Sequence, residues 1–184
     1  MAEPLQLLAD QLPTPIGIMR IVADEAGHLR VAFFAEQEAD VLRYLRHHYG
    51  ENGFTLEPAC DPHGITEAIT RYFAGELSAI DEIPVKAVGT GFQQEVWRAL
   101  RTIPCGSTIS YGKLAQQIGR PEAVRAVGLA NGANPIAVVV PCHRVIGANG
   151  SLTGYGGGID RKRWLLQHEM EGTGPGSLWP LIGA

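Results

Sequence analysis

The chain has 184 residues, of which 45% are hydrophobic and 18% are charged, and its formal net charge is −4. This composition excludes an intrinsically disordered chain, and the lack of a long apolar run excludes a protein that spans a membrane. Three scattered cysteines, and a start without the features of a signal peptide, favour a cytoplasmic protein without a disulfide framework.

The charge is divided unevenly along the chain. Residues 1–88 carry six Lys and Arg against 14 Asp and Glu, whereas residues 89–168 carry nine against three. A basic second half favours an anionic partner. We therefore expect two domains, residues 1–88 and residues 89–184, with their boundary in a stretch rich in Gly and Pro.

The first domain is expected to be a small α+β scaffold. Apolar and β-branched residues on both sides of a glycine-containing turn predict a hairpin over 15–35. Apolar residues at helical spacing predict helices over 36–48 and 64–74. Cys60 lies in a loop between two prolines, and we interpret it as inert. No histidine of this half has the spacing to a cysteine that a zinc site needs, so no metal is expected.

Two short helices are predicted in the basic half, after a core helix over 92–103 that opens with a capping box at Thr90. Ser110 can cap the first, over 111–118, and Pro121 takes the favoured first position of the next. Such a pair, joined by a tight glycine turn, indicates a helix-turn-helix motif.

The second of these helices is expected to present a face with little side-chain bulk. Arg125 shares this face with Gly128 and Gly132, and Ala126 and Ala130 lie beside it. A helical glycine costs about 1 kcal/mol relative to alanine, and the close approach of a nucleic acid is one reason to tolerate it. Taken alone, however, Arg125 fits better with an ordinary surface ion pair to Glu122.

A reactive cysteine is indicated after residues 136–140, a short apolar run expected to be a buried strand that ends at Pro141. Cys142 follows, with His143 and Arg144 directly after it. A thiol is a nucleophile only as the thiolate, which basic neighbours favour. These four residues alone fit a reactive cysteine and a buried structural one equally well.

A glycine-rich loop over 147–158 contains Tyr155 and suits a loop that wraps around a planar ligand. A last helix is predicted from about 160 to 169. Glu169 falls at the C-terminal end of that helix, where a carboxylate opposes the helix dipole. It therefore needs a compensating partner, for which His143 is the candidate.

Residues 92–169 resemble the methylated-DNA–protein-cysteine methyltransferases, also called O6-alkylguanine-DNA alkyltransferases. The matching segments are FQQEVW at 92–97, IPCG at 103–106, YGKLA at 111–115, RAVG at 125–128, NP at 134–135, PCHRVI at 141–146, GY at 154–155 and WLLQHE at 164–169. Residues 1–88 fit the family's N-terminal domain less specifically, and the chain resembles the constitutive bacterial form.

The resemblance implies an α+β protein with a ribonuclease-H-like N-terminal domain followed by a winged-helix-like C-terminal domain. It implies repair of double-stranded DNA, in which Cys142 irreversibly accepts an alkyl group from O6-alkylguanine or O4-alkylthymine. One molecule would act once, on a base flipped out of the duplex. No cofactor, metal or obligate protein partner is implied.

The resemblance also assigns catalytic roles. Glu169 would orient His143, which would deprotonate Cys142 through a water molecule. Tyr111 would donate a proton to the departing base as negative charge develops on it. These groups supply a nucleophile and a better leaving group, the two needs of attack by sulfur on a saturated carbon.

Binding roles follow from the same resemblance. The backbone of Val145 and of Gly156 would contact the base, Tyr155 would form a wall of the alkyl pocket, and Asn134 would brace the turn before the cysteine. The DNA-facing residues would be Arg125, Ala126, Gly128 and Ala130. Some relatives carry serine where this chain has Gly156, which leaves open the preference for methyl or bulkier alkyl groups.

Two other functions remain as alternatives. A DNA-binding module that senses lesions without reacting would not need Cys142. A thiol hydrolase would use Cys142 and His143 but would have no use for Arg125 and its smooth helix face.

Overall fold

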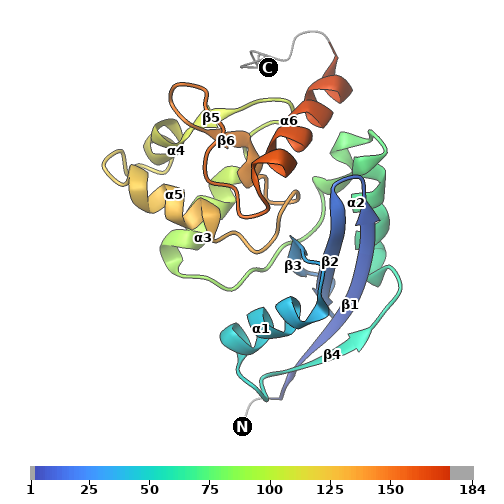
Figure 1. Ribbon diagram of the computed structural model, residues 1–184. Coiled ribbons are helices and arrows are strands. Elements are labelled where there is room, and N and C mark those ends of the chain that lie inside the picture. Colours follow the sequence, from blue (N-terminus) through green and yellow to red (C-terminus); the bar gives the residue numbers. More distant parts are fainter. Residues whose placement is uncertain (1–2, 175–184) are drawn as a thin grey trace.

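The structure, a computed structural model, describes residues 3–174 and has mixed α+β architecture. Residues 175–184, the end of the second expected domain, lie outside the described residues. A sheet with two helices forms the first half, and a mainly helical second half packs beside it (Figure 1). Within the described residues, no helix is both long and apolar enough to cross a bilayer.

The first half is built on a four-stranded sheet with the strand order β3-β2-β1-β4. Strands β2 (Gly17–Asp24) and β3 (Leu29–Phe34) are antiparallel, which confirms the predicted hairpin. Strand β1 (Leu5–Thr14) pairs antiparallel with β2, and β4 (Phe54–Pro58) runs parallel to β1. Neither β1 nor β4 was predicted, because half-exposed residues blur the apolar alternation of both strands.

The two faces of this sheet bury different partners. Helix α1 (Glu38–Tyr49) covers one face through a small cluster that contains Val22 and Leu45. Residues that alternate with Val22 along β2, such as Ile21, point to the other face and join the main core. That core includes residues of α2 (Ile65–Phe73) and of the second half, so one continuous core joins the two halves. Both predicted helices are confirmed, with ends within about two residues.

Short elements complete the order of the chain. The first half also contains the 3-10 helices η1 (Pro62–Gly64) and η2 (Leu77–Ile80). The second half contains α3 (Gly91–Leu100), β5 (Ile109–Ser110), α4 (Tyr111–Gln117), α5 (Val124–Gly132), η3 (Cys142–Arg144), β6 (Val145–Ile146) and α6 (Ile159–Thr173).

Local capping signals are confirmed in this half. Thr90 accepts a hydrogen bond from the backbone of Gln93, whose side chain accepts one from the backbone of Thr90, and this capping box opens α3. Ser110 caps α4 by accepting from the backbone N–H of Lys113 at 3.1 Å. Helix α3 ends at Leu100, three residues before the predicted end, and a turn follows.

The predicted start of the next helix is wrong. Pro121 does not open a helix, because α5 begins only at Val124. The Ala123 N–H donates to the Arg120 carbonyl at 2.9 Å, which closes a β-turn with Pro121 at its second position. The fixed φ of proline suits that turn position as well as the first position of a helix, so the residue alone could not decide.

Candidate active site

Cys142 follows a buried turn, and the strand predicted over 136–140 is wrong. Ala32 of the edge strand β3 forms one isolated bridge with Ile136, and the chain then turns away from the sheet. Val138 has a φ of +72°, and the Val140 N–H donates to the Ile136 carbonyl at 3.0 Å. The run is apolar because it is buried, and burial alone does not distinguish a turn from a strand.

Asn134 joins the two ends of this turn. Its Oδ1 accepts from the Ile136 N–H at 3.0 Å, and its Nδ2 donates to the Val140 carbonyl at 2.8 Å. One side chain thus replaces the ladder hydrogen bonds that a strand would have used. Val140, two residues before Cys142, is therefore held in place by a side chain that follows the end of α5.

Cys142 lies at the start of η3, with 6% of its surface exposed, and lines a cavity of about 260 Å³. The cavity is bounded by Asn134, by the glycine-rich segment around Tyr155 and Gly156, and by aromatic residues from the first half of the chain. The latter residues are Phe33, Phe34 and Tyr44. The sequence did not indicate that the first half would reach this cavity.

Burial raises the pKa of the Cys142 thiol, while a hydrogen bond with Asn134 and the ammonium group of Lys162 oppose that rise. Lys162 is fully buried, and its Nζ donates to the Val145 carbonyl at 2.6 Å and to the Thr153 carbonyl at 2.9 Å. Burial lowers the pKa of Lys162 to about 8. This cation, missed from the sequence, is thus the charged group that favours the thiolate.

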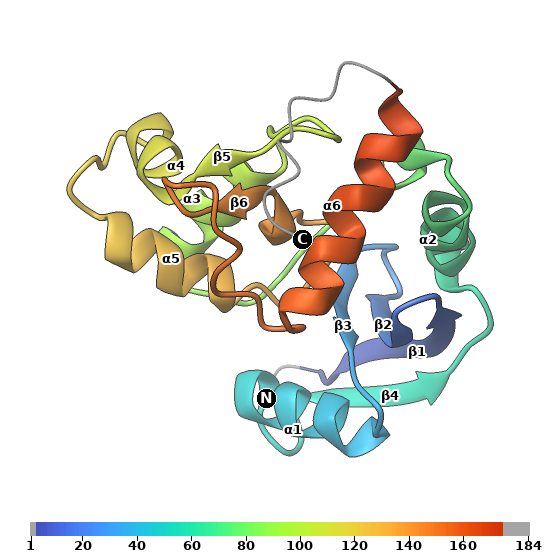
Figure 2. The same cartoon turned by 45° about the horizontal axis from the view of Figure 1, so that its top comes forward.

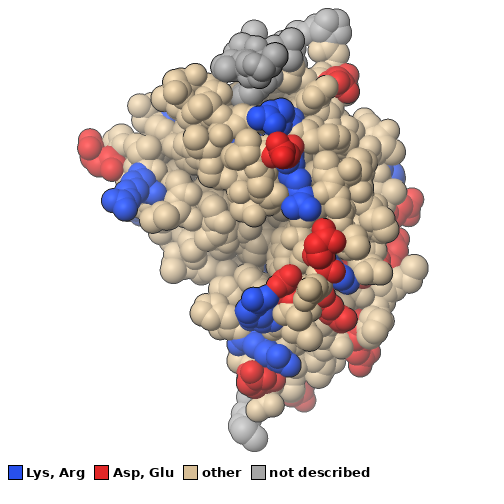
Figure 3. All heavy atoms as spheres, in the orientation of Figure 1, with Lys and Arg blue, Asp and Glu red and all other residues tan. Residues whose placement is uncertain are grey.

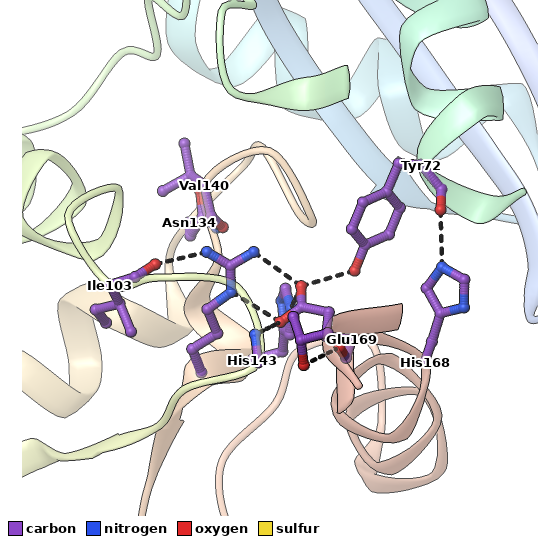
Figure 4. A network of polar contacts seen from close by, with 10 residues as sticks. Tyr72, Ile103, Asn134, Val140, His143, His168 and Glu169 are labelled. Atoms are coloured by element: carbon purple, nitrogen blue, oxygen red, sulfur yellow. Dashed lines mark hydrogen bonds and ion pairs between the residues drawn. The ribbon is translucent and has the colours of Figure 1, made fainter. Parts of the chain in front are cut away.

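His143 and Glu169 are in direct contact, as their placement in the sequence had suggested. His143 Nε2 lies 2.7 Å from Glu169 Oε1, and both side chains are fully buried (Figure 4). A carboxylate only accepts hydrogen bonds, so Nε2 carries the proton and Nδ1 is the basic nitrogen. No group among residues 3–174 donates to or accepts from Nδ1. Burial lowers the pKa of His143, which keeps the ring neutral near neutral pH.

The Glu169 carboxylate is the centre of a larger network. Arg144 donates to both of its oxygens at 2.9 Å, and the hydroxyl of Tyr72 donates to Oε1 at 2.8 Å. Burial alone would raise the pKa of Glu169, but His143 and Arg144 hold it well below its usual range. Arg144 was expected to favour the Cys142 thiolate; instead, its charge is paired with Glu169.

Helix α6 carries both Glu169 and Lys162 and lies between α2 and the rest of the second half (Figure 2). It extends to Thr173, so Glu169 is one turn inside the helix rather than at its end. Tyr72 reaches Glu169 from α2, and the sequence held no signal for this contact. Lys162 lies near the start of the helix, where a cation opposes the helix dipole, yet its long side chain reaches two carbonyl groups outside the helix.

The two tyrosines assigned to the site differ in their contacts. The Tyr111 hydroxyl donates to the Thr153 carbonyl at 3.0 Å, next to the point where Lys162 binds the same oxygen. Burial raises the pKa of Tyr111. The Tyr155 hydroxyl is buried and has no hydrogen-bond partner within the described part of the chain.

Helix α5 presents Arg125 to solvent, together with Ala126, but not Ala130. Ala130 is only 3% exposed and packs in the core, where its carbonyl accepts from Trp97 Nε1 at 2.8 Å. Its expected place on the exposed face is wrong, because five residues at about 100° each bring it about 140° away from Arg125. Gly128 is half-buried, close to the ring of Tyr111.

Three further features of residues 3–174 bear on the predictions: the contacts of Arg125, the groups that could hold a metal, and the two cysteines outside the cavity. Arg125 takes part in none of the ion pairs formed among residues 3–174, so the proposed pairing with Glu122 is not seen. These residues contain no group of three or more His, Cys, Asp and Glu side chains that could hold a metal. Cys60 is exposed, whereas burial and the Glu169 charge raise the pKa of Cys105 to about 12.

The chain is similar to proteins of one kind along most of its length. Residues 91–171 match the family model described as 6-O-methylguanine DNA methyltransferase, DNA binding domain. A methylated-DNA–protein-cysteine methyltransferase of Shigella flexneri is 50% identical over 165 residues, which cover 90% of this chain and 96% of that protein.

Solved structures agree with this similarity. The crystal structure of Mycobacterium tuberculosis O6-methylguanine methyltransferase has a TM-score of 0.74 and 43% identity, and the match covers 94% of this chain and 97% of that one. A Mycobacterium tuberculosis structure in complex with DNA has a TM-score of 0.73 and 44% identity, with 95% and 98% covered.

Proposed function

The chain belongs to the methylated-DNA–protein-cysteine methyltransferases, which repair DNA directly by transferring an alkyl group to a cysteine, and from this premise we propose that Cys142 is the acceptor. Cys142 lines the cavity and stands next to a His143–Glu169 pair whose free ring nitrogen can take a proton. That arrangement, a buried base beside a buried thiol, is the observation that carries the proposal.

The proposed reaction begins with loss of the thiol proton. His143 Nδ1 accepts it through a water molecule, and Glu169 stabilises the positive charge that forms on the ring. The Lys162 ammonium stabilises the Cys142 thiolate over the same interval. The thiolate attacks the alkyl carbon, a C–S bond forms, the C–O6 bond breaks, and its electron pair moves to the base. Tyr111 donates a proton to the leaving ring.

The base is held by backbone groups around the cavity. We assign acceptors for its exocyclic amine to the carbonyls of Cys142 and Val145, and a donor for O6 to the N–H of Gly156. The Val145 carbonyl already accepts from Lys162, but a carbonyl oxygen has two lone pairs. Tyr155 forms a wall of the alkyl subsite, and Asn134 keeps the turn before Cys142 in shape.

The proposed substrate is double-stranded DNA that contains O6-alkylguanine or O4-alkylthymine. A cavity that encloses Cys142 cannot admit a base while it is stacked in a duplex, so the nucleotide must flip out. Arg125, which is exposed and free of ion pairs within the described residues, is assigned to fill the gap left by the flipped nucleotide. Ala126 and Gly128 leave room around it.

We assign a ribonuclease-H-like fold to residues 1–88 and a winged-helix-like fold with a helix-turn-helix to residues 89–184. The strand order β3-β2-β1-β4 supports the first assignment, and the succession of α4, a tight turn and α5 supports the second. Because the two parts share one core, we expect them to unfold together rather than as independent units.

The proposal is tested by mixing the protein with a duplex that contains one O6-methylguanine and weighing the intact protein. A mass increase of one methyl group that maps to the peptide with Cys142 is expected. Replacement of Cys60 and of Cys105 by serine should leave the increase unchanged. Methylation of either of those residues, or no methylation at all, would contradict the assignment of Cys142.

A further inference from the structure

Helix α5 carries an exposed apolar side chain that the proposed function does not use. Within residues 3–174, only Val124 and Leu129 are large hydrophobic residues with exposed surfaces, at 39% and 70% respectively. A single exposed leucine needs no explanation by itself. Here both residues lie on the helix of Arg125, inside the segment that matches a DNA-binding domain.

Leu129 shares the face of Arg125. Four residues along a helix correspond to a rotation of about 40° and a rise of about 6 Å, so the two side chains stand one above the other. Val124 lies about 100° to the other side of Arg125. Gly132 lies about 60° from Leu129 around the helix, and a Cβ placed there would meet nothing within 4 Å, so this side of Leu129 is open.

The chemistry of this face suits the minor groove of DNA better than the major groove. Helices that read base edges in the major groove present several polar side chains, whereas the exposed face of α5 offers only Arg125 as a hydrogen-bonding group. The surface over α4 and α5, at the upper left of Figures 1 and 3, has few charged side chains on the side seen in Figure 3. Proteins of the minor groove combine arginine with apolar side chains that wedge into a base step.

We propose that Leu129 is such a wedge: it packs into the minor groove at the base step next to the flipped nucleotide, while Arg125 fills the gap. The inference rests on the proposed function, because it needs a duplex from which one nucleotide has been extruded. An apolar contact of this kind makes no hydrogen bond to a base edge, which suits repair of a lesion in any sequence context.

The test measures affinity for a methylated duplex in the Cys142→Ser background, with 2-aminopurine placed beside the lesion to report unstacking. Leu129→Ala should weaken the affinity for the duplex about tenfold, as expected when most of a buried leucine contact is lost. It should also reduce the increase in 2-aminopurine fluorescence that occurs when the protein binds. The slope of affinity against salt should not change, since no phosphate contact is removed. Leu129→Met should restore affinity, whereas Leu129→Asn should not.

Two controls separate this contact from other effects. Val124→Ala removes a comparable exposed side chain from the same helix and should change affinity less than about twofold. With Cys142 present, Leu129→Ala should react with free O6-benzylguanine at the wild-type rate, because the free base needs no opened duplex. Unchanged duplex affinity in Leu129→Ala, or an equal loss with the free base, would overturn the wedge.

The failure of this inference can be told from failure of the proposed function. If the wild-type protein does not become alkylated at Cys142, the proposed function is wrong, and the inference about Leu129 is wrong as well. If the wild-type protein is alkylated and Leu129→Ala binds and unstacks DNA like the wild type, only the wedge is wrong.

Discussion

The hydroxyl of Tyr72 donates a 2.8 Å hydrogen bond to Glu169, a residue 97 positions later in the chain. Both groups are fully buried. The first half of the chain therefore contributes directly to the network that orients His143, in addition to the aromatic residues that line the cavity.

Tyr72→Phe should lower the free energy of unfolding by about 1.5–3 kcal/mol, because a buried hydrogen bond to a charged group is lost. Tyr155→Phe is a matched control for stability, since the Tyr155 hydroxyl is buried without a partner among the described residues. It should cost less than about 0.5 kcal/mol. Urea unfolding of the three proteins measures the difference, and equal losses in the two variants would refute the importance of the contact.

Glu169→Gln should slow the single transfer by at least about 10²-fold without changing its end point, because the amide cannot stabilise a positive His143. It should also reduce stability by about 3–5 kcal/mol, since the buried Arg144 loses its charged partner. Single-turnover rates measured at a temperature well below the midpoint of thermal unfolding of the variant separate the effect on transfer from the effect on stability. A wild-type rate in folded Glu169→Gln would exclude the proposed role.

The pH dependence of the transfer should follow His143. Burial lowers the pKa of this group from its ordinary value of 6.5. The neutral form, which is the base, predominates above the folded-state pKa, so the rate should fall as the pH decreases, with the midpoint of the fall below pH 6.5. Single-turnover rates between about pH 5 and pH 8 measure this limb. A fall in rate centred above pH 6.5 would show that another group is being titrated.

Arg125→Ala should slow repair of a duplex by about 10²-fold, an effect of a few kcal/mol, while reaction with free O6-benzylguanine stays at the wild-type rate. Arg163→Ala is the control for charge, because Arg163 is an exposed cation of α6 whose ion pair within residues 3–174 is with Asp160 on its own helix. It should behave like the wild type on both substrates. An equal loss of rate on the duplex and on the free base would show that Arg125 does not act in base extrusion.

Features that depend on neighbouring residues were predictable from the sequence. The capping box at Thr90 and the cap at Ser110 use hydrogen bonds within three residues, so the pattern contains both partners. The Cys-His pair and Glu169 were recognisable from their residue types and from the resemblance to a known family.

Features that depend on distant contacts were not predictable. The apolar run before Cys142 forms a single bridge with the edge strand β3 and then turns away, and its residue types alone suggested a strand. The hydrogen bond between Tyr72 and Glu169 and the burial of Lys162 are not indicated by any pattern of neighbouring residues in the sequence. Each arises when α2, α6 and the cysteine segment pack together in three dimensions.

Stoichiometry tests the central claim most directly. A thioether on Cys142 should be stable, because a thiolate is a poor leaving group from a saturated carbon and His143 can only move protons. A known amount of protein is mixed with a large excess of duplex containing O6-methylguanine, and loss of the methyl group from DNA is followed to completion. We predict a plateau at about one methyl group per protein molecule, with Cys142→Ala inactive. Methyl loss that continues beyond one equivalent would contradict irreversible transfer to Cys142.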